Sequence, residues 1–201
     1  MGSALSDYAA LAPHVIKAHA HLSDDDIFRP VAAYLPTAPG TVLDIGAGIG
    51  RTAAWLSRQG IDVTAAEPVP ALRTAGQARC RHLPIRWIDD ALPRLKRTRA
   101  LGAAFDCVIL CGVWHHLPPD QRAGAMRNIR HLIGARGRVL ISLRHGPSPS
   151  GLTSYPVNPG DTVAQAQSHG LEKEFEATVP AVQSRNRAQG VTWTWVSLRP
   201  D

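Results

Sequence analysis

Short apolar runs recur along the middle of the chain, and most are followed by a segment with the apolar spacing of a helix. Strands are expected at 41–45, 62–67, 84–88, 105–110 and 137–143, and helices over 51–59, 70–80 and 119–133. Continuous apolar runs are typical of parallel strands buried on both faces. Alternation at this spacing favours right-handed βαβ units. The pattern therefore predicts a doubly wound α/β sheet with helices on both faces.

The C-terminal part departs from this alternation. A loop rich in Pro, Gly and Ser over 145–160 precedes a helix at 162–169, and strands follow at 171–179 and 191–198 with no helix between them. Strands joined without a crossover pair antiparallel. The last strand is therefore expected to run opposite to the others.

The first part of the chain predicts two helices, over 8–21 and 23–35. Ser23 followed by Asp26 resembles a capping box at the start of the second helix, with Asp in place of Glu. We expect one domain over 1–201, in which the helices of 1–38 form a candidate lid and 40–199 form the core.

Composition and charge narrow the class of protein. The 201 residues are 44% hydrophobic, and no apolar stretch approaches the ~18 residues that a membrane span requires. The start of the chain lacks a basic and apolar leader, and three cysteines are too few for a disulfide scaffold. The net charge of +6 comes mainly from arginines spread along the chain. These features predict a cytoplasmic protein without a membrane partner, for which nucleic acid is a disfavoured partner.

The segment VLDIGAGIGR (42–51) carries the most informative pattern. It places Asp44, Gly46, Gly48 and Gly50 where a buried strand turns into a helix, and ligands of open α/β sheets bind at such strand ends. The spacing differs from the G-x-G-x-x-G of dinucleotide sites, and a carboxylate precedes the turn. A carboxylate would repel pyrophosphate and attract an ammonium group. Glu67, at the end of the second strand, could accept hydrogen bonds from both hydroxyls of a ribose.

These residues resemble the class I S-adenosylmethionine-dependent methyltransferases. VLDIGAGIGR is similar to the first motif of that family, and Glu67 to its acidic residue after strand two. IDDAL (88–92), FDCVILCGVWHHLPP (105–119) and GARGRVLISL (134–143) resemble later motifs in the same order. The resemblance covers roughly residues 40–199. It implies a seven-stranded sheet of order 3-2-1-4-5-7-6 with an antiparallel last strand.

The resemblance also implies a cofactor, S-adenosylmethionine, with S-adenosylhomocysteine as product and no metal. Asp44 and the turn would meet the methionine portion, Glu67 would hold the ribose, and Asp90 would accept from the adenine amino group, with Asp89 as the alternative. Cys107 is expected in the core, and the backbone around Cys111 at the methionine ammonium. The full set of expected cofactor residues is Asp44, Gly46, Ala47, Gly48, Glu67, Pro68, Asp89, Asp90, Ala91 and Cys111.

The methyl acceptor is expected at the loops after strands four and five and before the last strand. His115 and His116 are candidate catalytic bases, with the alternative that one of them fixes the loop. Candidate substrate-binding residues are Trp114, Arg144, His145, Arg185 and Arg187. The arginines could clamp a carboxylate or phosphate, or they could belong to a solvated loop.

The resulting hypothesis is an enzyme that methylates an O or N atom of a small molecule, which could be anionic, and that acts as a monomer or homodimer. The alternatives are a nucleic-acid (RNA) methyltransferase, for which only the net charge speaks, and a non-catalytic S-adenosylmethionine-binding protein. A nicotinamide dehydrogenase is disfavoured by the glycine spacing.

Overall fold

The strands form the sheet that the sequence predicts. The computed structural model describes residues 2–148 and 151–201, and within them seven strands pair in the order β3-β2-β1-β4-β5-β7-β6. Their bounds are β1 (Thr41–Ile45), β2 (Asp62–Ala66), β3 (Ile85–Ile88), β4 (Phe105–Leu110), β5 (Ile133–His145), β6 (Leu171–Pro180) and β7 (Thr192–Pro200). β7 pairs antiparallel with both β5 and β6, whereas the other pairs are parallel. The predicted order and the reversed last strand are thus confirmed.

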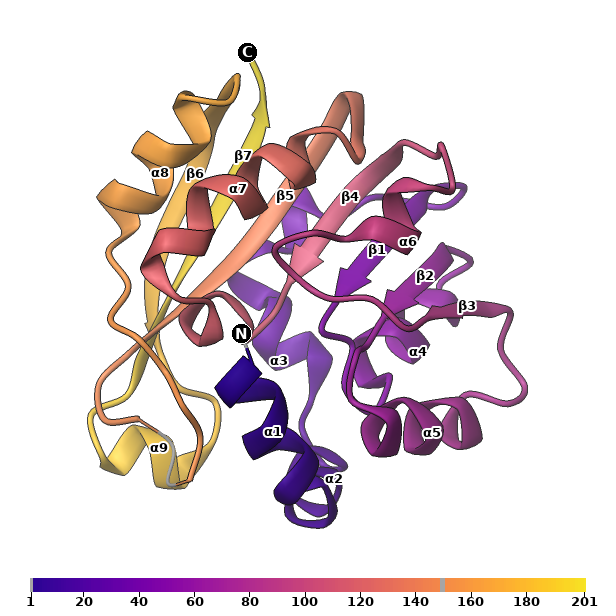
Figure 1. Ribbon diagram of the computed structural model, residues 1–201, viewed down its shortest axis with the longest axis vertical. Coiled ribbons are helices and arrows are strands. Elements are labelled where there is room, and N and C mark those ends of the chain that lie inside the picture. The colour runs from indigo at the N-terminus through magenta and orange to yellow at the C-terminus, as the bar shows by residue number, and fades with distance from the viewer. Residues whose placement is uncertain (1, 149–150) are drawn as a thin grey trace.

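Helices cover both faces of this sheet (Figure 1). α6, α7 and α8 lie in front of it in the view of Figure 1, while α3 and α4 lie behind. The helices are α1 (Gly2–Ala10), α2 (Ala12–His19), α3 (Asp24–Phe28), α4 (Arg51–Ser57), α5 (Pro70–Arg79), α6 (Lys96–Arg99), α7 (Pro119–Arg130), α8 (Pro159–Gln167) and α9 (Ser184–Ala188), with 3-10 helices η1 (Arg29–Tyr34) and η2 (Trp114–His116).

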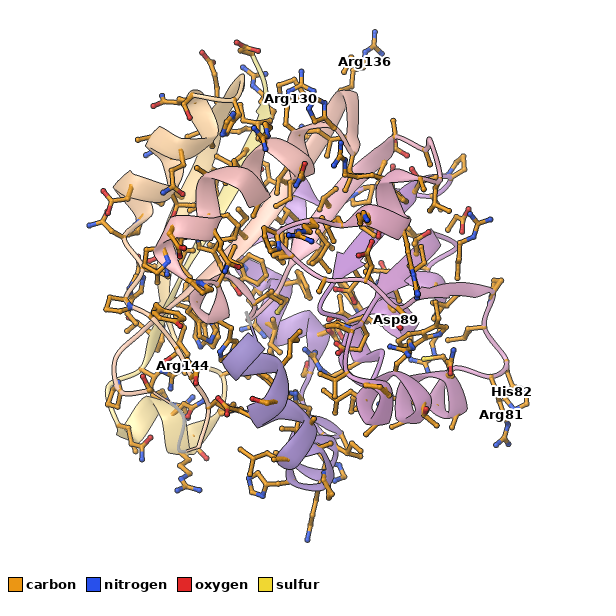
Figure 2. The ribbon with its side chains drawn as sticks, in the orientation of Figure 1. Arg81, His82, Asp89, Arg130, Arg136 and Arg144 are labelled. Carbon is orange, nitrogen blue, oxygen red and sulfur yellow. The ribbon has the colours of Figure 1, made fainter. Side chains whose placement is uncertain are left out.

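The carboxyl ends of the parallel strands meet at the lower end of the sheet, where α1, α2 and α9 also lie (Figure 1). Two labelled residues mark this end in Figure 2. Asp89, which follows β3, lies on one side of it, and Arg144, near the end of β5, lies on the other. Ligands of open α/β sheets bind at this end.

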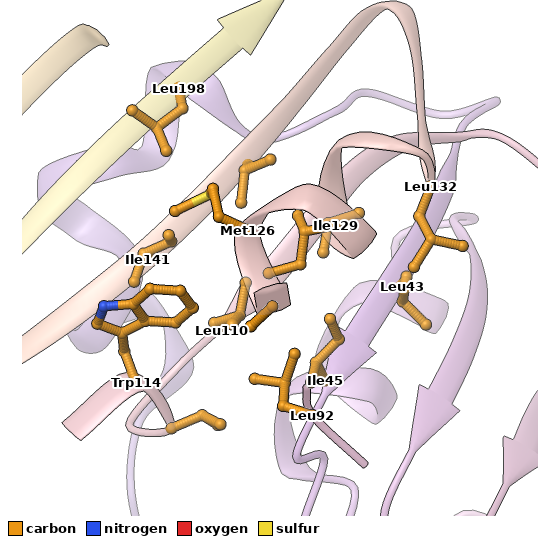
Figure 3. Packing of buried hydrophobic residues seen from close by; sticks show 14 of the residues in the cluster. Leu43, Ile45, Leu92, Leu110, Trp114, Met126, Ile129, Leu132, Ile141 and Leu198 are labelled. Carbon is orange, nitrogen blue, oxygen red and sulfur yellow. The ribbon is translucent and has the colours of Figure 1, made fainter. Parts of the chain in front are cut away.

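Strand alternation sends successive side chains of β1 to opposite faces. Leu43 and Ile45 join a buried cluster with Met126 and Ile129 of α7 (Figure 3). Val42 faces the other way, into a cluster that includes Phe28 of α3, Leu56 of α4 and Trp195 of β7. Asp44 shares the face of Val42, so its carboxylate lies at the edge of an apolar layer.

Proline decides where the N-terminal helices break. The single helix predicted over 8–21 is divided at Leu11, because Pro13 occupies the first turn of α2 and has no N–H to continue α1. Ser23 caps α3 as predicted, since its hydroxyl accepts from the amide of Asp26 at 3.2 Å. That α-helix ends at Phe28, and Pro30 opens the 3-10 helix η1 where the prediction continued the helix to residue 35.

Other boundaries also differ from the predicted ones. β5 begins at Ile133, and the pairing of β4 with β5 shifts register between Phe105 and Cys107. Gly137 permits that shift, because a Cβ there would lie 2.7 Å from the Phe105 carbonyl oxygen. α8 begins at Pro159, where the Asn158 side chain accepts from the amide of Asp161. The short elements α6, α9 and η2 were not predicted, and residues 149–150 of the predicted loop lie outside the described part of the chain.

Candidate active site

A cleft of about 1190 Å³ opens at the carboxyl ends of the strands. Its floor comes from the turn after β1 and from the ends of β2, β4 and β5, whereas α1 and α2 form its roof. One further wall comes from the segment with α9 and from the tryptophans of β7. The cleft therefore joins the predicted cofactor residues, except Asp89, to the predicted acceptor residues, except Trp114 and His145, in one space.

The glycine turn takes backbone conformations that favour glycine. Gly46, Gly48 and Gly50 have φ of +71°, +56° and +70°. The amide of Gly46 donates to the Ala66 carbonyl at 2.8 Å, which ties the turn to β2. A Cβ on Gly48 would meet no atom within 4 Å. The turn thus leaves open space where a ligand can approach the backbone.

Substitution of Gly46 should be more costly than substitution of a glycine with a similar φ and open surroundings. A Cβ at Gly46 would lie 2.6 Å from Cγ2 of Val113, while at Gly102 (φ +63°) nothing lies within 4 Å. We expect Gly102→Ala to lower the free energy of unfolding by roughly 1 kcal/mol through backbone strain alone. Gly46→Ala should cost at least about 1 kcal/mol more because of the clash. Urea denaturation of both variants checks this, and equal losses would contradict it.

Asp44 is a buried carboxylate with an unused acceptor. Its residue is 2% exposed, and Oδ2 has no hydrogen-bond partner in the described structure. Burial raises the pKa of Asp44 to about 7, the nearby carboxylate of Asp24 adds to the rise, and Arg51 opposes it. Such an atom at the edge of a cleft is suited to a cationic group of a ligand.

Glu67 braces the turn from the end of β2. Its Oε2 accepts from the amide of Gly48 at 2.7 Å, and Oε1 accepts from the amide of Val69 at 2.8 Å. Burial raises the pKa of Glu67, and these two backbone hydrogen bonds oppose the rise. Each oxygen retains acceptor capacity toward the cleft, which Pro68 also lines.

The two aspartates after β3 have different surroundings. Asp90 and Ala91 line the cleft, and Asp90 also fixes α6, since its Oδ2 accepts from the amide and the hydroxyl of Thr98. Asp89 does not line the cleft and forms ion pairs with Arg73 and Arg97. Asp90 is therefore the candidate for adenine, and Asp89 holds together surface segments.

The segment after β4 is linked to β5 by a hydrogen bond. Cys111 lines the cleft, and the amide of Gly112 donates to the Ser142 hydroxyl at 2.8 Å. Burial raises the pKa of Cys111 to about 12, so the thiol is uncharged at neutral pH. Cys107 is fully buried in the core, as predicted.

The two histidines of η2 are both buried beside the cleft, and they differ in their partners. Nδ1 of His116 lies 2.6 Å from the Thr153 carbonyl, so this nitrogen must carry the proton. Nε2 of neutral His116 then accepts from the Tyr8 hydroxyl at 3.0 Å. His115 is 3% exposed and its Nδ1 has no partner in the described structure. Burial lowers the pKa of both histidines, so both are neutral at pH 7.

Helix α1, which forms part of the roof, is hydrogen-bonded to Thr153 in the loop after β5. The Asp7 carboxylate accepts from the amide and the hydroxyl of Thr153, at 2.9 and 2.6 Å. These bonds bring together residues 146 positions apart in sequence. Together with the Tyr8–His116 contact, they place α1 over the part of the cleft lined by His115, His116 and Arg144. This part, where the methyl acceptor is expected, is called the acceptor end.

The three predicted arginines have different roles in the fold. Arg144 lines the cleft at 8% exposure, and its Nη1 donates to the Pro147 carbonyl. Arg187 also lines the cleft, and it donates to the carbonyls of Ala181 and Val182 of its own loop. Arg185 lies exposed on α9 at the cleft wall.

Two predicted substrate residues lie outside the cleft. Trp114 is 0% exposed and packs in the core with Met126 of α7 and Ile141 of β5 (Figure 3). His145 alternates with Arg144 along β5 and faces away from the cleft, and its Nε2 lies 2.8 Å from the Thr194 hydroxyl. This placement does not match the prediction for either residue.

Sequence reasoning missed Tyr8 and Trp193, which both line the cleft. Tyr8 lies 108 residues from its partner His116, so no local pattern joins them. Trp193 pairs with Arg144 across β5 and β7 on the same face of the sheet. The predicted antiparallel pairing, taken in the correct register, is the one signal that could have placed Trp193 here.

Known proteins with this arrangement are methyltransferases. A family model described as a methyltransferase domain matches residues 42–137. An uncharacterised methyltransferase of Mycobacterium bovis is 35% identical over 121 residues, which cover 57% of this chain and 58% of that protein. These two matches support a class I S-adenosylmethionine-dependent methyltransferase, and the family model places the methyltransferase domain at residues 42–137.

Solved structures of methyltransferases share the fold over nearly the whole chain. A TehB-like SAM-dependent methyltransferase from Corynebacterium glutamicum covers 98% of both chains with a TM-score of 0.64 and 24% identity. The 1,6-didemethyltoxoflavin-N1-methyltransferase of Burkholderia thailandensis, with 1,6-didemethyltoxoflavin and S-adenosylhomocysteine bound, covers 97% of this chain and 88% of its own, with a TM-score of 0.73 and 22% identity.

The chain spans 47% to 58% of the length of the curated relatives it matches. In the part of the chain that is described, none of its helices has the length and apolar character to cross a membrane. The same residues contain no group of three or more His, Cys, Asp or Glu side chains placed to hold a metal ion.

Proposed function

We propose that this protein transfers a methyl group from S-adenosylmethionine to an oxygen or nitrogen atom of a small molecule that carries an anionic group. The observation that carries the proposal is the unpartnered Oδ2 of Asp44, buried at the edge of the cleft. An ammonium group would satisfy it, and the open space at Gly48 and the carboxylate of Glu67 lie along the same wall. The donor set therefore fits a ligand that has both an ammonium group and a ribose.

When bound, S-adenosylmethionine supplies an electrophilic methyl group on a sulfonium centre. Asp44 would pair with the methionine ammonium beside the backbone of Cys111, Glu67 would accept from the ribose hydroxyls, and Asp90 with the Ala91 amide would hold the adenine. The residues Gly46, Ala47, Gly48 and Pro68 would shape the backbone around it. The roof of α1 and α2 would exclude water, and alignment inside such an enclosed site supplies much of the rate enhancement.

The acceptor must lose a proton when its methylated atom is neutral and protic. Tyr8 is placed to take that proton while its own hydroxyl proton passes to Nε2 of His116. The resulting imidazolium would be stabilised by its hydrogen bond to the Thr153 carbonyl and by nearby Asp7. In this scheme His116 acts through Tyr8, because both of its ring nitrogens already have partners.

The enclosure of the cleft supports a small acceptor. The roof helices α1 and α2 and the wall at α9 limit access to the acceptor end. The relative from Burkholderia thailandensis, which methylates a small heterocycle according to its description, supports this assignment by analogy. In Figure 2, Arg130 and Arg136 lie at the top of the molecule, Arg81 at the lower right and Arg144 at the lower left. These labelled arginines thus do not gather on one surface, which speaks against a single nucleic-acid surface.

Ligand-dependent stability and turnover test the proposal. S-adenosylmethionine and S-adenosylhomocysteine should each raise the melting temperature, because a ligand at 100 times its Kd contributes about 2.7 kcal/mol. NAD should not. Release of S-adenosylhomocysteine should then be measured with small hydroxy and amino acids and, in parallel, with RNA. Stabilisation by NAD alone would contradict the cofactor, turnover with RNA alone would favour the nucleic-acid alternative, and binding without any turnover would favour a non-catalytic binding protein.

A further inference from the structure

The acceptor end of the cleft contains a buried cation without a counter-charge. Arg144 forms no ion pair with any described residue, and its one hydrogen bond within that part of the chain goes to the Pro147 carbonyl. A guanidinium remains charged at physiological pH. A charge this deeply buried is costly unless it is paired. The free N–H groups of Arg144 therefore favour an anion in the cleft.

Among the described residues, no neighbouring group supplies that anion. The side chains that face Arg144 are Tyr8, His115 and His116, all uncharged at neutral pH. The carboxylates of Asp44 and Glu67 belong to the cofactor end. Carboxylates thus lie where the cationic cofactor would bind. Arg144 is the buried guanidinium at the acceptor end, and the exposed Arg185 and Arg187 line the wall there at α9.

The walls around Arg144 are apolar and aromatic. Trp193 pairs with Arg144 across the two strands, and its indole extends over the end of β4 toward Gly112. The ring of His115 packs edge-on against that indole, with centroids 5.7 Å apart. Leu5 and Leu11 of the N-terminal segment also line the cleft, and they pack in the cluster of Val15 of the roof. A flat apolar body would fit between the indole and this roof.

We propose that the acceptor is an aromatic carboxylate, whose charged group binds Arg144 and whose ring packs on Trp193. A single guanidinium matches a carboxylate in charge and in its two-pronged geometry. The inference rests on the proposed function, since the cofactor must fill the other half of the cleft.

Calorimetry on the protein saturated with S-adenosylhomocysteine tests the inference with defined probes. Benzoate should bind at least tenfold more tightly than benzamide, which has the same shape and no charge, and more tightly than inorganic phosphate. Arg144→Gln should weaken benzoate binding about 10-fold to 100-fold, the usual effect of losing a charged hydrogen bond. Arg144→Lys should recover part of this loss. Arg86→Gln, which removes an exposed arginine on β3, should change nothing.

The outcomes separate the two proposals. If S-adenosylhomocysteine does not bind, the proposed function fails. If it binds while benzamide or phosphate matches benzoate, or while Arg144→Gln leaves benzoate affinity unchanged, the aromatic carboxylate is overturned. An unchanged affinity of Arg144→Gln for S-adenosylhomocysteine shows that the variant is folded.

Discussion

Replacement of Asp44 by asparagine is expected to weaken binding of S-adenosylmethionine by a factor of at least about 30. The substitution keeps the size of the side chain and removes the charge that would face the methionine ammonium. Loss of one partner of a buried, hydrogen-bonded charge pair costs about 2–5 kcal/mol, and 2 kcal/mol corresponds to about 30-fold in Kd. Calorimetric titration measures the effect.

The matched control is Asp62→Asn, an exposed aspartate at the opposite end of the sheet. It should leave the Kd unchanged. If Asp44→Asn binds the cofactor as tightly as the parent protein does, Asp44 does not hold the ammonium.

The pKa of Asp44 also predicts a pH dependence of binding. Because burial raises this pKa to about 7, the carboxylate is mostly protonated at pH 5.5 and mostly ionised at pH 7.5. Only the ionised form attracts an ammonium, so the affinity for S-adenosylmethionine should rise by roughly 25-fold between these pH values. Titrations at both pH values check this, and in Asp44→Asn the rise should disappear.

The same substitution should stabilise the protein without ligand. A carboxyl group whose pKa is higher in the folded state than in the unfolded state binds more protons when folded. The contribution of Asp44 to the stability of the parent protein should therefore fall as the pH rises from about 4 to 7. At pH 8, Asp44→Asn should raise the free energy of unfolding by roughly 1–4 kcal/mol, and at pH 3 the difference should vanish. Urea denaturation of both proteins at pH 3 and pH 8 measures this. Equal differences in the free energy of unfolding at the two pH values would contradict it.

Replacement of Tyr8 by phenylalanine is expected to lower kcat for a protic acceptor by a factor of about 100 or more. Proton transfer by a positioned side chain typically contributes 10²–10⁴-fold. The change removes one oxygen and leaves the ring on His116, to which it packs edge-on at 5.1 Å. The Kd for S-adenosylhomocysteine should stay the same, since no hydrogen bond to the cofactor residues is lost. Steady-state kinetics at saturating cofactor measure kcat. Saturation removes the effect that protonation of Asp44 has on cofactor binding.

Two further measurements separate proton transfer from packing. His116→Gln should lower kcat to a similar level, and the double variant should be no slower, because the two residues act as one unit. In the parent, kcat should rise with pH through the pKa of His116, which burial lowers below its ordinary value. Tyr34→Phe is the control, since Tyr34 stacks on Phe175 away from the cleft. Additive losses in the double variant would contradict the relay.

The sequence by itself determined the sheet and the cofactor turn. Each parallel strand is a short apolar run, and burial on both faces allows few other residues there. Asp44 and the glycines lie within a few positions of one another, so strand, turn and helix fix their geometry locally. Glu67 could be assigned for the same reason, because it ends the strand that pairs with β1.

Side-chain direction was decided by tertiary structure. Trp114 and His115 are adjacent in sequence, yet the turn of η2 buries one in the core and leaves the other on the cleft. Arg144 and His145 face opposite sides of β5, and only the register with β7 shows which side is the cleft. The sequence alone did not separate the roles of Asp89 and Asp90. In the folded chain Asp89 forms ion pairs with Arg73 and Arg97, whereas Asp90 accepts a hydrogen bond from the amide of Thr98.

The acceptor end depended on contacts between distant parts of the chain. Tyr8 meets His116 across 108 residues, and Asp7 meets Thr153 across 146. Single hydrogen bonds of this kind leave no periodic pattern in the sequence. Each requires only one donor and one acceptor residue, and it sets no requirement on the residues between them. Hydrophobic burial, in contrast, repeats along every strand and helix, so the sequence determined the fold and the turn where the cofactor is expected. Only the folded chain brings together the residues at the end where the acceptor is expected.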